Sequence, residues 1–470
     1  MARPLLVTLI KTVFWKSPRA LVTRTNAFLD AHRVAYYSVV VVVFAVAAAV
    51  RAWAAPLSSG VDPPQFWAFA KVFTMYGLDF YKYSGGTMPI YPTPGWAFVY
   101  PPLWLLISTA SLLCVPGSLA TSTMVSVSWR VAEKAPIIAA DLAIGGLLLW
   151  AVPGSKLTRL LLAGLWLFHP TAWYNSAVFG QFDAVAAAFL LASVILFRRG
   201  NDWLGFVFAG LAILTKQHTA IPVLVMLAVL ARQLPRRRLI RGLAIMGGMA
   251  LALSLPFVFD GNLVPYLKAV LFPAQAPTYQ YPLVYAFNGP ASLITYLHDT
   301  FGWNIEYLLR YDAAVLILAV GAVTVFAYVK RITIEQAALA GILVFIALFY
   351  RVNYQYLVIY IPLAILALST VRWGAQKALA LALALVPAAW VFLFSVSFWF
   401  NYLVPRHPEL VESLVRAGMG RFMPDYTFVT ISMVIMMLSV AYIIQVLAQG
   451  RAVRMTAGVP ADYGQQRSLP

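Results

Sequence analysis

The sequence predicts an all-α polytopic membrane protein with about 12 transmembrane helices. Hydrophobic residues make up 62% of the 470 residues and charged residues only 11%, whereas soluble domains carry about 25% charged residues. Apolar runs near twenty residues recur from Tyr36 onward, and each can cross about 30 Å of hydrocarbon as a helix. The runs are rich in Ala, Val, Gly and Pro and lack the alternation of strands, which favours helices over a barrel.

The first element is a basic and apolar segment, residues 1–35, which is predicted to be cytoplasmic, amphipathic and different from a signal peptide. The chain then divides into a transmembrane module (36–371), C-terminal transmembrane helices (372–450) and a cytoplasmic tail (451–470). The predicted spans are 36–54, 133–152, 158–176, 180–197, 203–217, 218–232, 237–257, 310–329, 334–350, 355–371, 377–400 and 426–448.

One further apolar run, residues 96–115, decides the topology. If it does not span, the basic clusters between the other spans lie on the same side as the basic N-terminus, as the positive-inside rule requires. We therefore expect an interfacial or re-entrant helix inside an external loop, residues 55–132, and both termini in the cytoplasm. A loop of this length exceeds a simple connection. Chemistry is expected on the non-cytoplasmic face, which argues against soluble nucleotide sugars and ATP as co-substrates.

The net charge of +18 lies mostly in these short loops, where Lys and Arg meet membrane lipids, so no nucleic-acid partner is predicted. The single Cys114 excludes an intramolecular disulfide and a thiolate metal site, and the five histidines form no ligand pattern. No metal site or cofactor is assigned, although a divalent metal is compatible with the sequence. The chain also lacks a nucleophile triad, a P-loop and a dinucleotide fingerprint.

Asp62 is the first carboxylate after the first span, and it precedes a short predicted helix that Gly77 ends. It could act as a general base toward an acceptor hydroxyl, or it could cap that helix. The aromatic residues of the same loop are expected to form mostly an interfacial belt. Tyr100, in the turn Tyr100-Pro101-Pro102, is the aromatic residue favoured for a functional role.

Two helical features carry further candidates. Arg130, Lys134 and Asp141 share one helix face through spacings of four and seven. The two cations could hold a phosphate, and the alternative is an ion pair within the membrane that satisfies Asp141. Gln181 and Asp183 follow a glycine turn, and Asp183 could order a hydroxyl, a lysine or a metal, or serve as a helix cap.

Later polar breaks supply the remaining candidates. Lys216 interrupts a long apolar stretch and either faces a cavity that takes a lipid phosphate or lies in a plain hairpin turn. Arg351 could bind a phosphate through two donors or could meet lipid headgroups. Asn288 and His298 are weaker candidates.

The order of these motifs resembles the GT-C superfamily of multi-spanning glycosyltransferases. The motifs are an acidic residue after the first span, Tyr-Pro-Pro-Leu, Lys…Asp, Gly-Gln-Phe-Asp, a lysine–glutamine break and a late polar turn. Within that superfamily, the chain resembles the GPI-anchor-type mannosyltransferases and the dolichyl-phosphate-glucose glucosyltransferases. The resemblance implies inverting hexose transfer, with mannose favoured, from a polyprenyl or dolichyl phosphate donor to a lipid-linked glycan acceptor.

In that resemblance Asp62 would be the catalytic base. The turn Tyr100-Pro101-Pro102 would shape the site, and Gly180, Gln181 and Asp183 would support it. Lys216 and Arg351 would be candidates for phosphate binding. The turn Asn353-Tyr354-Gln355-Tyr356 departs from the His-Glu-Arg/Lys-Tyr of many relatives, which leaves both the role of Arg351 and the donor sugar open. No Trp-Trp-Asp motif is present, which argues against a peptide acceptor.

A transporter or flippase of lipid-linked sugars is the alternative, with Asp141 and Lys216 lining its pathway, although inverted repeats are not evident. A purely structural subunit is a third alternative. The favoured location is the plasma membrane of a prokaryote, or the endoplasmic reticulum membrane in a eukaryote.

Overall fold

A computed structural model describes residues 18–57, 60, 62–259, 261–271, 288–371, 374–403 and 425–449. These residues form helices joined by turns and irregular segments, with one isolated antiparallel bridge between Asn288 and Val352. The predicted all-α polytopic class is therefore confirmed.

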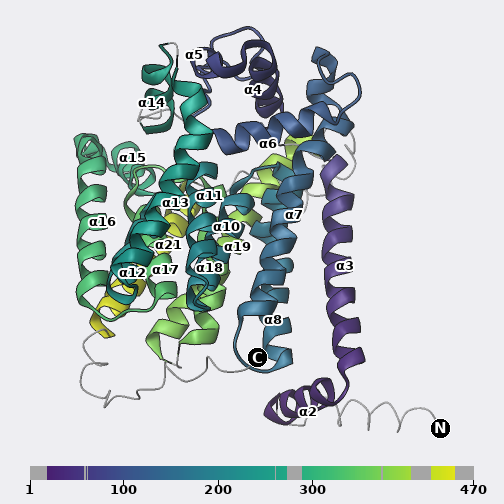
Figure 1. Cartoon of the computed structure of the whole chain (residues 1–470), viewed down its shortest axis with the longest axis vertical. Coiled ribbons are helices and arrows are strands. Elements are labelled where there is room, and N and C mark those ends of the chain that lie inside the picture. Colours follow the sequence, from purple (N-terminus) through teal and green to yellow (C-terminus); the bar gives the residue numbers. More distant parts are fainter. Residues whose placement is uncertain are drawn as a thin grey trace, which may run out of the picture.

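The outer loop and its partners form short helices at one end of the molecule. They are α4 (Asp62–Tyr76), η1 (Gly77–Asp79), α5 (Phe80–Tyr83), α6 (Pro102–Leu113), η2 (Thr121–Val125), η5 (Leu255–Val258), α14 (Leu263–Leu271), α15 (Pro290–Phe301) and η7 (Glu306–Tyr311). Helix α2 (Pro18–Ala31) lies at the opposite end (Figure 1).

The remaining helices run between these two ends. They are α3 (Arg33–Leu57), α7 (Val127–Ala151), α8 (Lys156–Leu167), α9 (Pro170–Trp173), η3 (Tyr174–Phe179), α10 (Asp183–Arg198), α11 (Asp202–Thr215), η4 (Gln217–Thr219), α12 (Ala220–Gln233), α13 (Arg236–Ser254), α16 (Asp312–Val329), α17 (Ile334–Leu348), η8 (Tyr354–Tyr356), α18 (Leu357–Thr370), α19 (Ala375–Leu403) and α21 (Asp425–Gln449).

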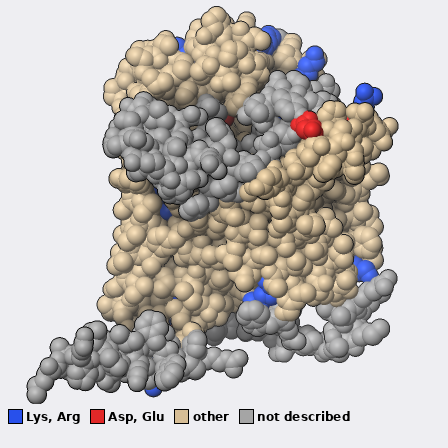
Figure 2. Space-filling view, turned by 180° about the vertical axis from the view of Figure 1, so that it is seen from behind, with Lys and Arg blue, Asp and Glu red and all other residues tan. Residues whose placement is uncertain are grey.

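Basic side chains connect several loops at the α2 end through bonds to backbone carbonyls and to a carboxylate. Lys156 donates to the carbonyl of Leu29 at the end of α2 (2.9 Å). Arg198 donates to the carbonyl of Ala151 (2.6 Å) and approaches Glu335 at 3.4 Å. These contacts agree with the predicted gathering of basic loops on the side of the N-terminal segment. Most of the charged residues visible in Figure 2 lie toward its upper and lower parts, with an uncharged band between them.

Helix length explains where a site can form. Within the part of the chain that the structure describes, five stretches are long and apolar enough to cross a membrane: Arg33–Leu57, Val127–Ala151, Arg236–Val258, Glu306–Val329 and Tyr426–Gln449. Helices α11, α12 and α18 have 14 residues each, or about 21 Å at 1.5 Å per residue, which is short of about 30 Å of hydrocarbon. Helix α6 lies across this bundle (Figure 1) and contacts α7 and α11. It lies within the predicted interfacial segment, and the chain just before it is bonded to the break that follows α11, where Gln217 donates to the Val99 carbonyl.

The outer loop has an aromatic core of its own, which corrects the expectation that its aromatic residues form mainly an interfacial belt. Phe69, Phe80 and Phe98 are buried and meet edge to face at 5.2 to 6.3 Å between ring centroids. Trp104 of α6 stacks on Phe182 at 4.5 Å, just before α10 begins. A long loop buries its aromatic side chains against each other because that removes more apolar surface from water than a place in the interface would. The loop is thereby a fixed cap.

Candidate active site

Asp62 begins α4 and lies in the first turn of that helix. Its Oδ2 accepts a hydrogen bond from the side-chain amide of Gln355 (3.4 Å), and the side chain of Gln181 also bonds to its carboxyl group. Pro63 and Pro64 follow and lack a backbone N–H, so the alternative role as a helix cap has few donors to satisfy. The geometry favours the functional interpretation of Asp62.

The environment of Asp62 changes its acidity. Burial of the carboxyl group raises its pKa from 3.8 to about 6, while Gln181, Lys216 and Gln355 act in the opposite direction. The residue keeps a partly exposed surface. A carboxylate with this pKa is mostly ionised at neutral pH and is a stronger base than an ordinary aspartate.

Lys216 and Asp183 form a fully buried ion pair with 2.6 Å between Nζ and Oδ1. Lys216 has an extended backbone (φ −147°, ψ 113°) between α11 and η4, and this break aims its side chain at the start of α10. The ammonium lies 4.3 Å from the ring centroid of Tyr356 and 4.8 Å from that of Phe182. Asp183 suits the N-terminal turn of α10, where the helix dipole favours an anion. Of the partners that the sequence left open for Asp183, the structure therefore shows a lysine, Lys216.

Tyr100 lies against the same pair, with its ring centroid 5.6 Å from the Lys216 ammonium. Its carbonyl accepts a hydrogen bond from the Tyr81 hydroxyl (2.9 Å), and the neighbouring Val99 carbonyl accepts one from the Gln217 side chain (2.7 Å). The outer loop and the break after α11 are therefore fixed to each other at Tyr100.

The turn after η3 connects Asp62 to the bundle. Gly180 has φ 82° and ψ 46°, a left-handed conformation that glycine adopts without strain. A Cβ at this position would lie 2.8 Å from Cγ of Pro63 and 3.0 Å from Cε of Lys134. The amide of Gly60 donates to the Phe179 carbonyl (2.9 Å). The segment that carries Asp62 therefore rests directly on this turn.

Lys134 stabilises the turn after η3 through hydrogen bonds to backbone carbonyls. Its Nζ lies 3.0 Å from the Ala55 carbonyl, 2.9 Å from that of Ala177 and 3.0 Å from that of Val178. With these charge-assisted bonds the buried ammonium joins the end of α3 to η3. This geometry favours a structural role for Lys134 over phosphate binding. Arg130, one turn earlier on α7, is half-buried.

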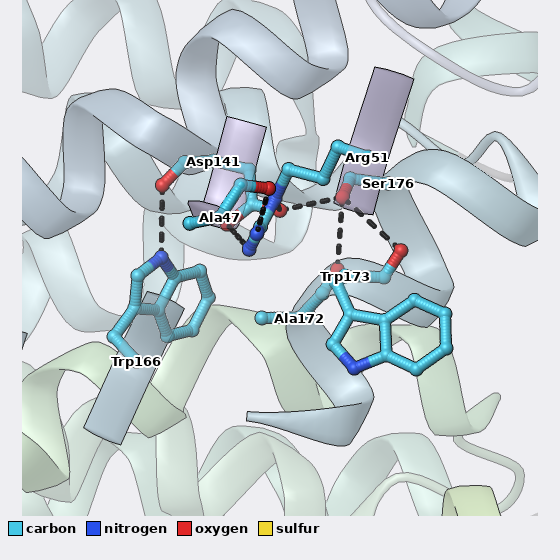
Figure 3. Close-up of polar contacts among 7 residues, drawn as sticks. All are labelled: Ala47, Arg51, Asp141, Trp166, Ala172, Trp173 and Ser176. Carbon is cyan, nitrogen blue, oxygen red and sulfur yellow. Dashed lines mark hydrogen bonds and ion pairs between the residues drawn. The ribbon is translucent and has the colours of Figure 1, made fainter. Parts of the chain in front are cut away.

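Asp141 has the ion-pair partner that its place within a span requires. Arg51 donates from Nε to Oδ2 (2.7 Å) and from Nη2 to Oδ1 (3.0 Å), and both side chains are buried. Ser176 of η3 donates to the same carboxylate, and the Trp166 indole donates to the Asp141 carbonyl at 2.8 Å (Figure 3). The cluster links α3, α7 and η3 and supports the structural alternative for Asp141.

Arg351 lies in the turn between α17 and α18. The turn is fixed by the paired backbones of Asn288 and Val352, with N···O distances of 2.8 and 2.6 Å. Arg351 is half-buried, lies 5.8 Å from the ring centroid of Tyr350 and acts electrostatically on Tyr356. It therefore lies near Tyr356, whose ring the Lys216 ammonium approaches.

His298 contacts Glu306 on another part of the outer end, and among the described residues no group of three or more His, Cys, Asp or Glu could hold a metal ion.

Sequence reasoning missed two buried charges. Arg51 stands in the predicted first span, and the demand of Asp141 for a partner was the signal that could have identified it. Glu133 precedes Lys134 and is fully buried, and its two carboxyl oxygens have no hydrogen-bond partner. A Cβ on Gly180 would lie 3.2 Å from one of these oxygens.

The brought-together set therefore consists of Asp62, Tyr100, Gln181, Asp183 and Lys216, with Gln355 as an addition and Arg351 at its border. A base of raised pKa, two amides and a buried cation suit proton removal from a hydroxyl next to a developing negative charge.

Comparison with known proteins gives one family. Glycosyltransferase family 87 matches residues 90–353, which is more than half of the chain and leaves Asp62 outside the matched region. The solved structure "Crystal Structure of ArnT from Cupriavidus metallidurans bound to Undecaprenyl phosphate" is similar with a TM-score of 0.40 and 14% identity. The alignment covers 89% of this chain and 78% of that chain. The search of curated proteins gives no match.

Proposed function

The chain belongs to glycosyltransferase family 87, and from this premise we propose that it transfers a hexose, mannose being favoured, from a polyprenyl phosphate to a lipid-linked glycan. The family confirms the predicted resemblance to glycosyltransferases. The reaction would take place at the end of the molecule that carries α4 and α6, opposite α2.

In the proposed mechanism Asp62 takes the proton of the acceptor hydroxyl. The acceptor oxygen forms a bond to the anomeric carbon as the bond from that carbon to the phosphate oxygen breaks, with inversion. The leaving polyprenyl phosphate carries the electron pair away as an anion, so no acid needs to protonate it. Arg351 would bind the phosphate, since a guanidinium offers two parallel donors.

Lys216 would act differently from Arg351. Its ammonium is fully buried and already paired with Asp183, and it lowers the pKa of Asp62. We infer that the pair keeps Asp62 ionised in its partly buried position and adds positive potential where the phosphate departs. Gln181 and Gln355 would fix the orientation of the Asp62 carboxylate.

The observation that carries this proposal is the meeting of Asp62 with Gln181, Gln355 and Lys216 in one group. The transporter alternative is not favoured by the geometry. Asp141 and Lys216, the two charges that would line its pathway, are each neutralised in a buried ion pair.

The test is transfer by the purified full-length chain in lipid nanodiscs, with polyprenyl-phosphate-mannose and a lipid-linked glycan. Polyprenyl-phosphate-glucose and polyprenyl-phosphate-arabinose are offered in parallel to identify the sugar. We expect Asp62→Asn to lower kcat at least about 100-fold, since a general base contributes 10²–10⁴-fold.

Asp79→Asn is the matched control, because Asp79 belongs to the same outer cap but pairs with Lys82 at its surface. It should transfer at the wild-type rate. Full transfer by Asp62→Asn would refute the assignment of the base.

A further inference from the structure

A cavity lies at the α2 end of the bundle, opposite the end that carries Asp62. It has a volume of about 450 Å³ and lies between the loop that joins α10 to α11 and the first turns of α13. Its lining includes Arg199, Arg238 and Arg241, with Asp202, Phe206 and Ile245. The proposed glycosyl transfer uses none of these residues.

The cavity has an excess of positive charge. Three guanidinium groups line it and only one carboxylate, Asp202, which approaches Arg238 at 3.3 Å. Arg199 lies 3.6 Å from the ring centroid of Trp150 and donates to the Trp150 carbonyl (2.9 Å), which fixes this cation at the cavity.

The charges at the beginning of α13 also favour the binding of an anion. The helix starts with Arg236, Arg237 and Arg238, has Arg241 one turn later, and carries no acidic residue in its first turn. Cations are disfavoured at the N-terminal end of a helix, where the dipole is positive. An anion bound among these arginines would remove the repulsion.

From the arginines toward the middle of the bundle, the cavity is lined by apolar side chains. Phe206 of α11 packs so closely on α13 that a Cβ on Gly242 would lie 2.1 Å from its ring. Ile245 continues the apolar wall along α13, and Trp203 stands at the rim with 60% of its surface exposed, as aromatic residues do at a membrane interface. The arginines lie near the start of α13, and Phe206 and Ile245 line the cavity farther along α11 and α13. This order matches a lipid, in which a charged headgroup is followed by an acyl chain. A free phosphate would use only the cationic part.

We propose that this cavity binds the phosphate of an anionic phospholipid from the leaflet on the α2 side, with an acyl chain along α11 and α13. Basic recesses between transmembrane helices suit such headgroups. The site is separate from the proposed transfer site, so either assignment can fail without the other.

The experiment is native mass spectrometry of the full-length protein with equal amounts of phosphatidylglycerol and phosphatidylcholine. We expect one retained phosphatidylglycerol per chain, and we expect it to raise the melting temperature. The variant Arg238→Gln/Arg241→Gln should weaken retention about tenfold or more, because it removes two charge-assisted contacts. The matched control Arg236→Gln/Arg237→Gln changes the same charge on the same helix outside the cavity lining, and it should retain the lipid.

Equal losses of lipid retention in both double variants would mean that positive charge anywhere at the start of α13 suffices, and would overturn the specific site. Displacement of the lipid by inorganic phosphate at the same concentration would overturn the lipid assignment, and so would equal retention of phosphatidylcholine. A wild-type melting temperature of the cavity variant without added phosphatidylglycerol would show that it is folded. A loss of retention accompanied by unfolding is resolved with Arg238→Lys/Arg241→Lys, which restores the charge and should recover binding.

Discussion

Gly180→Ala tests whether the turn after η3 positions Asp62. Two independent features of Gly180 oppose a side chain. Its φ of 82° is left-handed, and a Cβ would lie 2.8 Å from Cγ of Pro63 and 3.0 Å from Cε of Lys134. Pro63 is joined directly to Asp62, so any shift that relieves the contact with Pro63 also moves the proposed base.

The magnitude follows from these two terms. A left-handed conformation costs an L-residue about 1–2 kcal/mol, and an added methyl group in a packed region costs about 1–3 kcal/mol. Together they predict a loss of about 2–5 kcal/mol in the folding free energy. A displacement of about 1 Å at the reacting group lowers the rate by about 100-fold. We therefore expect Gly180→Ala to lower both the melting temperature and kcat.

Gly95→Ala is the matched control. Gly95 belongs to the same outer loop and has φ 81°, but a Cβ there would meet nothing within 4 Å. This variant has the conformational strain without the contact with Pro63, so its transfer rate should remain near that of the wild type. Melting temperature and single-turnover transfer are measured for both variants. A wild-type kcat in Gly180→Ala, or an equal loss in Gly95→Ala, would refute the positioning role of this contact.

Two further predictions concern Asp62 and the Arg51–Asp141 pair. The value of kcat/KM should rise with pH up to about 6 and then level off. The reason is that Asp62, whose pKa is raised to about 6, accepts a proton only when it is ionised. A flat profile between about pH 5 and 7 would contradict this role. Arg51→Met should lower the free energy of unfolding by about 3–5 kcal/mol, since it leaves Asp141 buried without its cation. Arg51→Met/Asp141→Leu should recover most of that loss in thermal unfolding, and a double variant less stable than Arg51→Met would contradict the pairing.

Residue patterns predicted the helical class and the polarity of the bundle. Both follow from composition along the chain, since an apolar run of sufficient length forms a helix in a membrane wherever it occurs. The position of Asp62 after the first span and the glycine turn before Asp183 could be predicted for the same reason, because each lies at the end of an apolar run.

The roles of individual charged residues could not be predicted as well from the sequence. Lys134 and Asp141 were candidates of two kinds, and only their partners separated the alternatives: three backbone carbonyls for one and Arg51 for the other. The aromatic residues of the outer loop were expected in the interface, and the fold buries most of them in a cap.

The sequence by itself therefore determined that the chain is a helical membrane protein with its polar breaks at one end, because hydropathy is a local property. The tertiary structure alone decided which breaks meet. Asp62 and Gln355 are separated by 293 positions, and whether they touch depends on how the helices pack and how far the short ones reach. Packing also determined which buried charge has a partner, because an ion pair depends on distance in space and not on separation along the chain.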